Sequence, residues 1–138
     1  MKETPDPTQI SILLVEDEVA ALELLANIVP KKFPGVALYT ATDGRAALKL
    51  FKAHRSEIVI TDINMPEMNG AKLIAEIRAI KPDVQIIVLT GDSGKASLEA
   101  SIGGGFEIDH YIVKPVDFGL LFAGIEECLA KSRSKTLP

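Results

Sequence analysis

The sequence is poor in cysteine and in long apolar runs, and each shortage excludes a class of protein. It contains a single cysteine, Cys128, so no internal disulfide can form. Its apolar neighbours predict a buried thiol in a reducing compartment. No apolar run approaches the ~18 residues that a membrane-spanning helix needs. The opening residues, MKETPDPTQ, lack the apolar core of a signal peptide. We therefore expect a cytoplasmic protein.

Basic residues are also in the minority. Fifteen Lys and Arg against nineteen Asp and Glu give a net charge of −4 and a pI of about 5.2. Nucleic-acid-binding modules usually carry a basic excess, so direct nucleic acid binding is not expected, although a small basic patch is compatible with these totals. A length of 138 residues with 47% hydrophobic residues predicts one globular domain with a true core.

Five short apolar runs alternate with segments of helical spacing. Four of the runs are rich in β-branched residues, and several are apolar on nearly every residue, as in strands buried on both faces of a parallel sheet. They are Ile10–Val15, Val36–Ala41, Ile58–Thr61, Val84–Thr90 and Asp109–Lys114. Strict alternation predicts right-handed crossovers and an α/β fold, a five-stranded parallel sheet with helices on both faces.

The segments between these runs carry apolar stripes at helical spacing. The stripes are Ala21, Leu22, Leu25, Ile28 and Val29; Ala47, Leu50 and Phe51; Leu73, Ile74, Ile77 and Ile80; and Phe118, Leu121, Phe122, Ile125 and Leu129. Asn69 and Asp117 are expected to cap the third and last helices. Residues Ser93–Ile102 have few large apolar side chains, so a helix there should be the least firmly packed.

We expect one domain over residues 9–131, with flexible polar tails at 1–8 and 132–138. The seven residues after the last helix, SRSKTLP, are too few for a further domain. The chain is therefore expected either to act alone through a protein partner or to be one piece of a longer protein.

Polar side chains stand where the predicted strands end. In an open parallel sheet the carboxyl ends of the strands meet at one edge, and ligands bind outside that edge. Glu16-Asp17-Glu18 follow the first run and Asp62 follows the third; Thr90 ends the fourth and Lys114 the fifth. Two carboxylates ~4 Å apart repel by roughly 4 kcal/mol at an effective dielectric constant near 20. This cluster therefore requires raised pKa values or a cation.

The expected ligands are all oxygens, which favour Mg²⁺ over zinc. They are Glu16, Asp17, Asp62 and the backbone carbonyl of Asn64. Asp62 can then attack phosphorus as a nucleophile, and Lys114 and the Thr90 hydroxyl can contact the transferred oxygens. The alternative is that the acids merely favour helix N-termini. A helix N-terminus would explain a single acid. It explains less well why acids follow two of the predicted strands and a lysine follows a third.

Four motifs together resemble the receiver domains of two-component response regulators. They are LLVEDE (Leu13–Glu18), DINMPEMNG (Asp62–Gly70), VLTG (Val88–Gly91) and YIVKP (Tyr111–Pro115), within a similarity that covers about residues 9–131. The resemblance implies a flavodoxin-like, CheY-like fold with strand order 2-1-3-4-5. It also implies that the donor is a phosphohistidine on a histidine kinase or phosphotransfer protein, and that a downstream protein or a fused output domain reads the signal.

The resemblance also implies a role for each residue. Asp62 would be the phospho-acceptor. Asp17 would be the more direct metal ligand of the acidic pair and Glu16 would act through water. Thr90 and Lys114 would be the switch hydroxyl and the phosphate-binding lysine, and Tyr111 the aromatic residue that moves inward on activation.

Two features depart from the family pattern. The acidic pair is Glu-Asp rather than Asp-Asp, which is a common variant. The segment Gly103–Phe106 replaces a short turn, and the interval from Thr90 to Lys114 is about two residues longer than usual. The shape of the fourth helix, and of the output surface beside it, therefore does not follow from the resemblance.

Three other interpretations fit parts of the sequence. A phosphatase of the haloacid dehalogenase type needs D-x-D near the first strand, whereas Asp62 and Asn64 follow the third and lack the second acid. A P-loop needs G-x-x-x-x-G-K-[ST], which residues 91–96 do not provide. A receiver-like docking scaffold without phosphorylation is the main alternative, but the acidic pair, Asp62, Thr90 and Lys114 favour a phospho-accepting domain. Such a domain would be no enzyme beyond phosphorylating and dephosphorylating itself.

Overall fold

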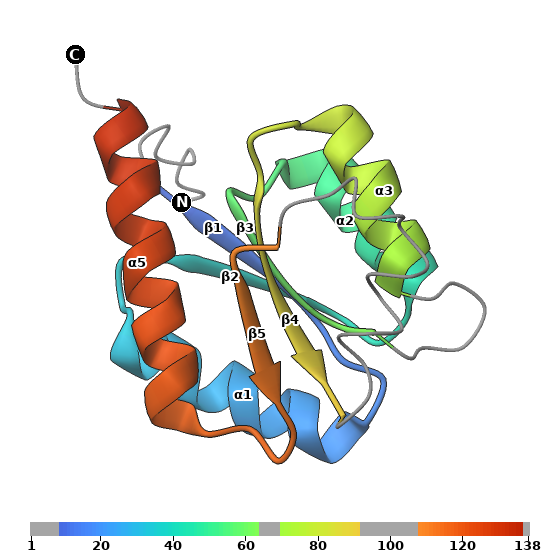
Figure 1. The fold of residues 1–138 in the computed structure, drawn as a ribbon, viewed down its shortest axis with the longest axis vertical. Helices are drawn as coiled ribbons and strands as arrows, with labels where there is room; N and C mark the ends of the chain where they lie inside the picture. The colour runs from blue at the N-terminus through green and yellow to red at the C-terminus, as the bar shows by residue number, and fades with distance from the viewer. Residues whose placement is uncertain (1–8, 64–69, 92–107, 137–138) are drawn as a thin grey trace, which may run out of the picture.

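The computed structural model describes residues 9–63, 70–91 and 108–136, and within them five strands form one parallel sheet. The strands are β1 (Ser11–Val15), β2 (Ala37–Ala41), β3 (Ile58–Asp62), β4 (Gln85–Thr90) and β5 (His110–Val113). Their order across the sheet is β2-β1-β3-β4-β5, and every neighbouring pair is parallel (Figure 1). The predicted α/β fold, the strand positions and the strand order are confirmed.

Two layers of helices cover the sheet. The described helices are α1 (Val19–Lys32), α2 (Gly44–His54), α3 (Gly70–Ile80) and α5 (Phe118–Thr136). α1 and α5 pack on one face, and α2 and α3 pack on the other (Figure 1). The expected helix at Ser93–Ile102 and the expected cap Asn69 lie outside the described residues. No helix in the described ranges is long and apolar enough to cross a bilayer.

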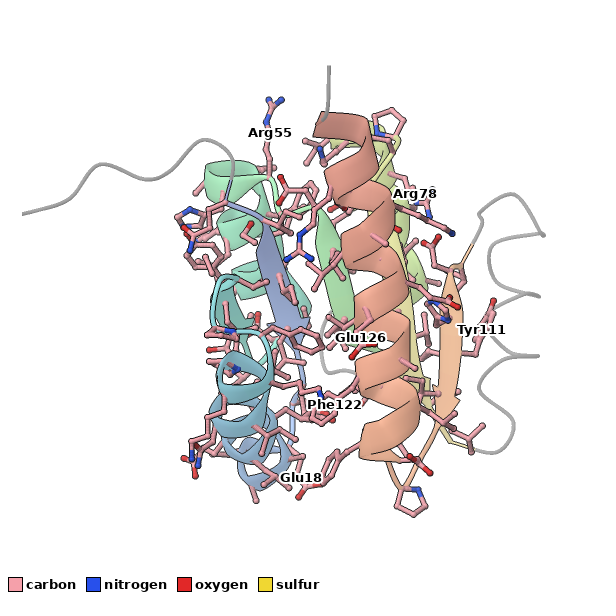
Figure 2. The ribbon with its side chains drawn as sticks, turned by 90° about the vertical axis from the view of Figure 1, so that its left-hand side faces the viewer. Glu18, Arg55, Arg78, Tyr111, Phe122 and Glu126 are labelled. Carbon is pink, nitrogen blue, oxygen red and sulfur yellow. The ribbon has the colours of Figure 1, made fainter. Side chains whose placement is uncertain are left out.

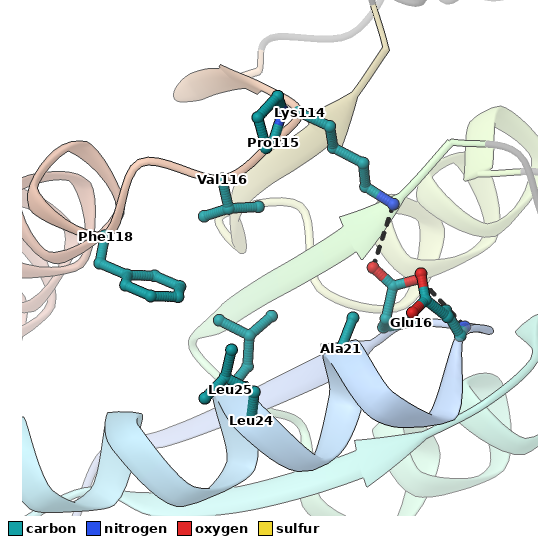
Figure 3. Close-up of a pocket in the computed structure, with 9 residues that line it drawn as sticks. Glu16, Ala21, Leu24, Leu25, Lys114, Pro115, Val116 and Phe118 are labelled. Carbon is teal, nitrogen blue, oxygen red and sulfur yellow. Dashed lines mark hydrogen bonds and ion pairs between the residues drawn. The ribbon is translucent and has the colours of Figure 1, made fainter.

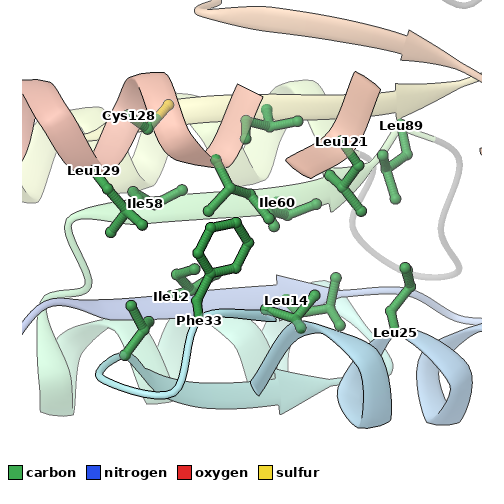
Figure 4. Close-up of a cluster of buried hydrophobic side chains, with 14 of the residues drawn as sticks. Ile12, Leu14, Leu25, Phe33, Ile58, Ile60, Leu89, Leu121, Cys128 and Leu129 are labelled. Carbon is green, nitrogen blue, oxygen red and sulfur yellow. The ribbon is translucent and has the colours of Figure 1, made fainter. Parts of the chain in front are cut away.

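The core consists of two clusters, one on each face of the sheet. Along β1, Ile12 and Leu14 face α1 and α5, whereas Leu13 and Val15 face α2 and α3. Figure 4 shows the first of these clusters, where Phe33 and Leu121 close over the strands. Burying a side chain of this size contributes about 1.5–3 kcal/mol. The central strands are therefore held from both sides, which explains why they read as unbroken apolar runs.

Helix ends follow side-chain and backbone hydrogen bonds. Asp117 caps α5 as predicted, because its Oδ1 accepts a hydrogen bond from the Leu120 N–H at 3.1 Å. α1 continues two residues past Pro30. Pro30 lacks an N–H but lies in the last turn, where only one helical bond is lost. The helix is closed by the Phe33 N–H, which donates to the Val29 carbonyl at 2.9 Å.

Two expectations for the last helix differ from the structure. α5 runs to Thr136, into the segment 132–138 that was expected to be a flexible tail. The cause is a tertiary contact: Ser132 is buried, and its hydroxyl accepts a hydrogen bond from Gln85 Nε2 at 2.7 Å. Phe118, expected in the buried stripe, is 38% exposed. It begins α5 beside a cavity rather than against the sheet.

Cys128 should be almost unreactive in the folded protein. Its side chain is 1% exposed, and burial, with a smaller contribution from the charge of Asp109, raises the pKa of the thiol to about 12. Because the thiolate is the reactive form, we expect Ellman's reagent at pH ~8 to react on the order of a hundred-fold more slowly than in urea-unfolded protein. Equal rates in the two states would show that Cys128 is accessible.

Candidate functional site

The carboxyl ends of four strands bring the predicted polar residues to one edge of the sheet. Asp62 pairs in register with Leu89, and Thr90 pairs with Val113, so the ends of β3, β4 and β5 are level. Val15 pairs with Thr61, which places Glu16 next to Asp62. These residues are far apart in the sequence, and the parallel pairing of the strands brings them to the same edge. Of the predicted site residues, only Asn64 lies outside the part of the chain that the structure describes.

Lys114 links two buried carboxylates. Its Nζ donates to Asp62 Oδ2 at 2.8 Å and to Glu16 Oε1 at 3.1 Å. Glu16 is 1% exposed and Asp62 is 7% exposed, so little water screens either charge. Figure 3 shows Lys114 reaching from the end of β5 toward Glu16 at the end of β1. A cation is therefore already in contact with the proposed nucleophile.

Burial and pairing act in opposite directions on these groups. Burial raises the pKa of Glu16, although hydrogen bonds from the Glu18 N–H and from Lys114 oppose the rise. Burial alone would lower the pKa of Lys114, but its hydrogen bonds to Asp62 and Glu16 outweigh that effect and raise it above its ordinary value of 10.5. Lys114 is therefore a cation at neutral pH. Its pairing stabilises the fold below pH 10.5, and this contribution is lost as the pH rises through the folded-state pKa.

Three carboxylates of the site could hold a metal ion. Glu16, Asp17 and Asp62 each place one oxygen within 4.8 Å of the others, and Asp17 is exposed to incoming solute. Oxygen ligands suit Mg²⁺, which needs neighbouring ligand oxygens roughly 3 Å apart to reach bond lengths of about 2.1 Å. The carboxylates would have to draw together by up to about 2 Å, a change within reach of side-chain rotation. The three carboxylates therefore fit a Mg²⁺ site.

Thr90 and Tyr111 lie on the face of the sheet that carries α2 and α3. Thr90 is buried, and its hydroxyl donates to the Gly91 carbonyl at 3.1 Å rather than to a site residue. Tyr111 pairs in register with Val88 and packs partly against the cluster under α2 and α3. Figure 2 shows its ring pointing away from α5. The two residues share a face, as a coupled movement would require.

A cavity of about 310 Å³ opens beside the site, between α1 and the segment that joins β5 to α5. Its inner wall includes Glu16 and Lys114, and the rest of its lining is apolar except for Glu18, with Leu24 and Phe118 among the apolar residues (Figure 3). This cavity was not among the features predicted from the sequence. The available signal was Leu24, an apolar residue outside the α1 stripe, which is 49% exposed.

Gly70 allows α3 to approach the site closely. A Cβ at this position would lie 2.7 Å from the Asp62 carbonyl oxygen and 2.8 Å from the Ile63 Cα. The Gly70 N–H also donates to the Ile63 carbonyl at 2.6 Å. The start of α3 therefore fixes the backbone that carries Asp62, and it can do so only without a side chain.

Comparison with known proteins identifies the family. The model of the response regulator receiver domain matches residues 12–126. The chain therefore belongs to the receiver domain family of two-component response regulators.

The relatives include an uncharacterized response regulatory protein of Staphylococcus epidermidis. It is 36% identical over 107 residues, which are 77% of this chain and 41% of that protein. The transcriptional regulatory protein GlrR of Escherichia coli is 30% identical over 91% of this chain and 27% of its own length. This chain thus spans less than half of these two curated relatives.

A similar solved structure is the signal receiver domain of an HD domain-containing protein from Pseudomonas fluorescens. Its TM-score is 0.81 at 30% identity, and the match covers 91% of this chain and 98% of that one.

Gly70→Ala should destabilise the protein by about 1–3 kcal/mol, because the added methyl group meets backbone atoms that cannot rotate away. Gly35→Ala is the matched control, since a Cβ there meets nothing within 4 Å. It should be neutral or stabilising by up to about 1 kcal/mol. Urea unfolding of both variants measures the difference. Equal effects would show that α3 does not depend on the close approach.

The free energy of unfolding of Glu16→Gln, relative to that of the native metal-free protein, should rise as the pH increases above 4.5, the ordinary pKa of a glutamate. The folded-state pKa of Glu16 is raised, so the folded state binds more protons than the unfolded state, and ionisation of Glu16 weakens folding. The test is urea unfolding in EDTA at about pH 4 and about pH 8, with the exposed Glu23→Gln as control. A Glu16→Gln effect that is the same at both pH values would contradict this.

Proposed function

We propose that Asp62 accepts a phosphoryl group in a Mg²⁺-dependent reaction, and that a domain over residues 9–131 uses this step to switch a protein-interaction surface. The donor is a phosphohistidine of a histidine kinase or phosphotransfer protein, and the buried, reduced Cys128 is consistent with action in the cytoplasm. The observation that carries the proposal is the contact of Lys114 Nζ with Asp62 Oδ2 at 2.8 Å, beside the carboxylates of Glu16 and Asp17.

In the proposed reaction a carboxylate oxygen of Asp62 attacks phosphorus, the P–N bond to the donor histidine breaks, and the imidazole leaves with the bonding electron pair. Lys114 neutralises a phosphoryl oxygen, which is the main demand of this chemistry. Glu16, whose oxygen lies 3.1 Å from Nζ, orients that lysine. Bound by Glu16, Asp17 and Asp62, Mg²⁺ would supply further positive charge to the phosphoryl oxygens. The chemistry is limited to this transfer and to hydrolysis of the domain's own phosphate.

The cavity between α1 and α5 suits the approach of the donor. Leu24 and Phe118 are large apolar side chains left 49% and 38% exposed at its rim, and Lys114 lies at its inner wall. An amphipathic helix of the donor can cover these residues while its histidine faces Asp62. The apolar rim would then supply affinity, and the charged wall would supply the chemistry.

The phosphate would act by favouring one of two conformations. Thr90 donates to the Gly91 carbonyl in this structure, and a phosphoryl oxygen offers it a stronger, charged acceptor. Rotation of Thr90 toward that oxygen would vacate space on the face that Tyr111 shares. A shift from 1:99 to 99:1 requires about 5.5 kcal/mol, and new contacts from Lys114, Thr90 and a metal ion to a dianion can supply it.

The switched surface would bind a downstream protein or an output domain in the same protein. GlrR is by name a transcriptional regulatory protein, and this chain matches 27% of its length. The remainder of such a protein has the length for a separate output domain.

Incubation with acetyl phosphate and Mg²⁺ should add the mass of one phosphoryl group to the intact protein. Asp62→Asn should abolish the gain, because the amide is a poor nucleophile, and EDTA should abolish it in the native protein. Asp43→Asn is the control: Asp43 caps α2 through the Ala46 N–H, which an asparagine can also do. Full labelling of Asp62→Asn would refute the site. Failure of the native protein with acetyl phosphate and with phosphorylated donor proteins would favour the docking scaffold.

A further inference from the structure

The exposed side of α2 carries a row of cations that the proposed phosphorylation does not use. Arg45, Lys49 and Lys52 are spaced i, i+4, i+7, so they lie on one side of the helix, and Arg55 follows at the C-cap. All four side chains are exposed, and residues 44–55 contain no Asp or Glu. We call these four residues the α2 ridge.

The ridge concentrates positive charge in an acidic chain. The net charge of the protein is −4, so the chain without the four positive charges of the ridge carries −8. The position of the charges is fixed, because Ala47 and Phe51 on the opposite side of α2 are fully buried in the core. The ridge is therefore a rigid basic surface on a molecule that is acidic elsewhere.

Three of the four ridge cations have no carboxylate partner among the described residues. Lys49, Lys52 and Arg55 form no ion pair with any residue in the described ranges. The pairs Arg45–Lys49 and Lys49–Lys52 are like charges one turn apart, and each such pair destabilises a helix by about 0.2–0.5 kcal/mol. A row of like charges at this spacing weakens the helix unless something outside it supplies the opposite charge.

We propose that the α2 ridge docks an acidic segment of a partner protein. The ridge extends over eleven residues, from Arg45 to Arg55, or about 15 Å along a helix, which matches three or four carboxylates on one side of a short helix. Duplex nucleic acid carries a charge every ~1.7 Å over long distances, and anionic membranes extend in two dimensions. Both extend well beyond so short a ridge on a chain of net negative charge, whereas a short acidic segment matches its length.

The ridge also offers a partner a flat aromatic surface at its C-terminal end. The rings of Tyr39 and His54 stack with centroids 3.8 Å apart and planes 9° apart, and His54 is exposed next to Arg55. An apolar residue after the acidic ones in the partner could rest on the His54 ring. The surface thus combines charge along α2 with one aromatic contact at its end.

The test uses the full chain and a fluorescein-labelled helical peptide of about fifteen residues with glutamates at i, i+4, i+7 and i+11 on one side. Fluorescence anisotropy at low salt should show saturable binding that weakens as salt rises. Lys49→Glu/Lys52→Glu should weaken binding by about ten-fold or more. Lys31→Glu/Lys32→Glu makes the same change in net charge on the exposed last turn of α1 and should alter binding less than about three-fold.

Several outcomes would overturn the proposal. The proposal would be wrong if the native protein failed to bind the peptide, or if both double variants weakened binding equally. It would also be wrong if the backbone amide chemical-shift changes on titration lay away from α2. The protein could instead bind an oligonucleotide, duplex or single-stranded, or phosphatidylserine vesicles more tightly than it binds the peptide. If Lys49→Glu/Lys52→Glu abolished that binding, the ridge would be assigned to nucleic acid or membrane. Lys49→Gln/Lys52→Gln separates charge from misfolding: a folded variant by circular dichroism with intermediate affinity supports the proposal, and one with native affinity refutes it.

Discussion

Lys114 joins the ends of three strands through two hydrogen-bonded ion pairs, and the geometry of the site depends on this contact. Glu16 and Asp62 come from strands buried on both faces, so their charges have little water to screen them. Lys114 is 98 residues from one and 52 from the other along the chain. The parallel sheet, with β3 between β1 and β4, brings them together. The cation makes it possible to keep two buried carboxylates close together at this edge of the sheet.

The site lies at the boundary between the two helical layers. Toward α1 and α5, Glu16 and Lys114 form the wall of a cavity with an apolar rim. Toward α2 and α3, Thr90 ends β4 on the face where Tyr111 packs. A group bound to Asp62 can therefore contact a partner on one face of the sheet and bias side chains on the other. Gly70 fixes the backbone that follows Asp62, because its N–H donates a hydrogen bond to the Ile63 carbonyl at 2.6 Å.

The sequence predicts the sheet well because burial on both faces leaves unbroken apolar runs. It also predicts which polar residues gather at one edge of the sheet, because parallel strands end together. It does not predict which acids Lys114 contacts, since a hydrogen bond across 98 residues has no local signature. The length of α5 was missed for the same reason: Gln85 holds Ser132 from a distant strand. The exposure of Phe118 was missed because helical spacing alone does not show where the sheet ends. Asn64 and the expected fourth helix lie outside the described ranges.

The two charged regions of the surface are separated by the fold. The cavity beside Lys114 lies under α1 and α5, and the α2 ridge lies in the layer on the other face of the sheet. A donor at the cavity and an acidic segment at the ridge would therefore contact different faces of the protein. The side chains under α2, where Phe51 and Val15 share one cluster with Tyr111, offer a route of coupling between the two surfaces.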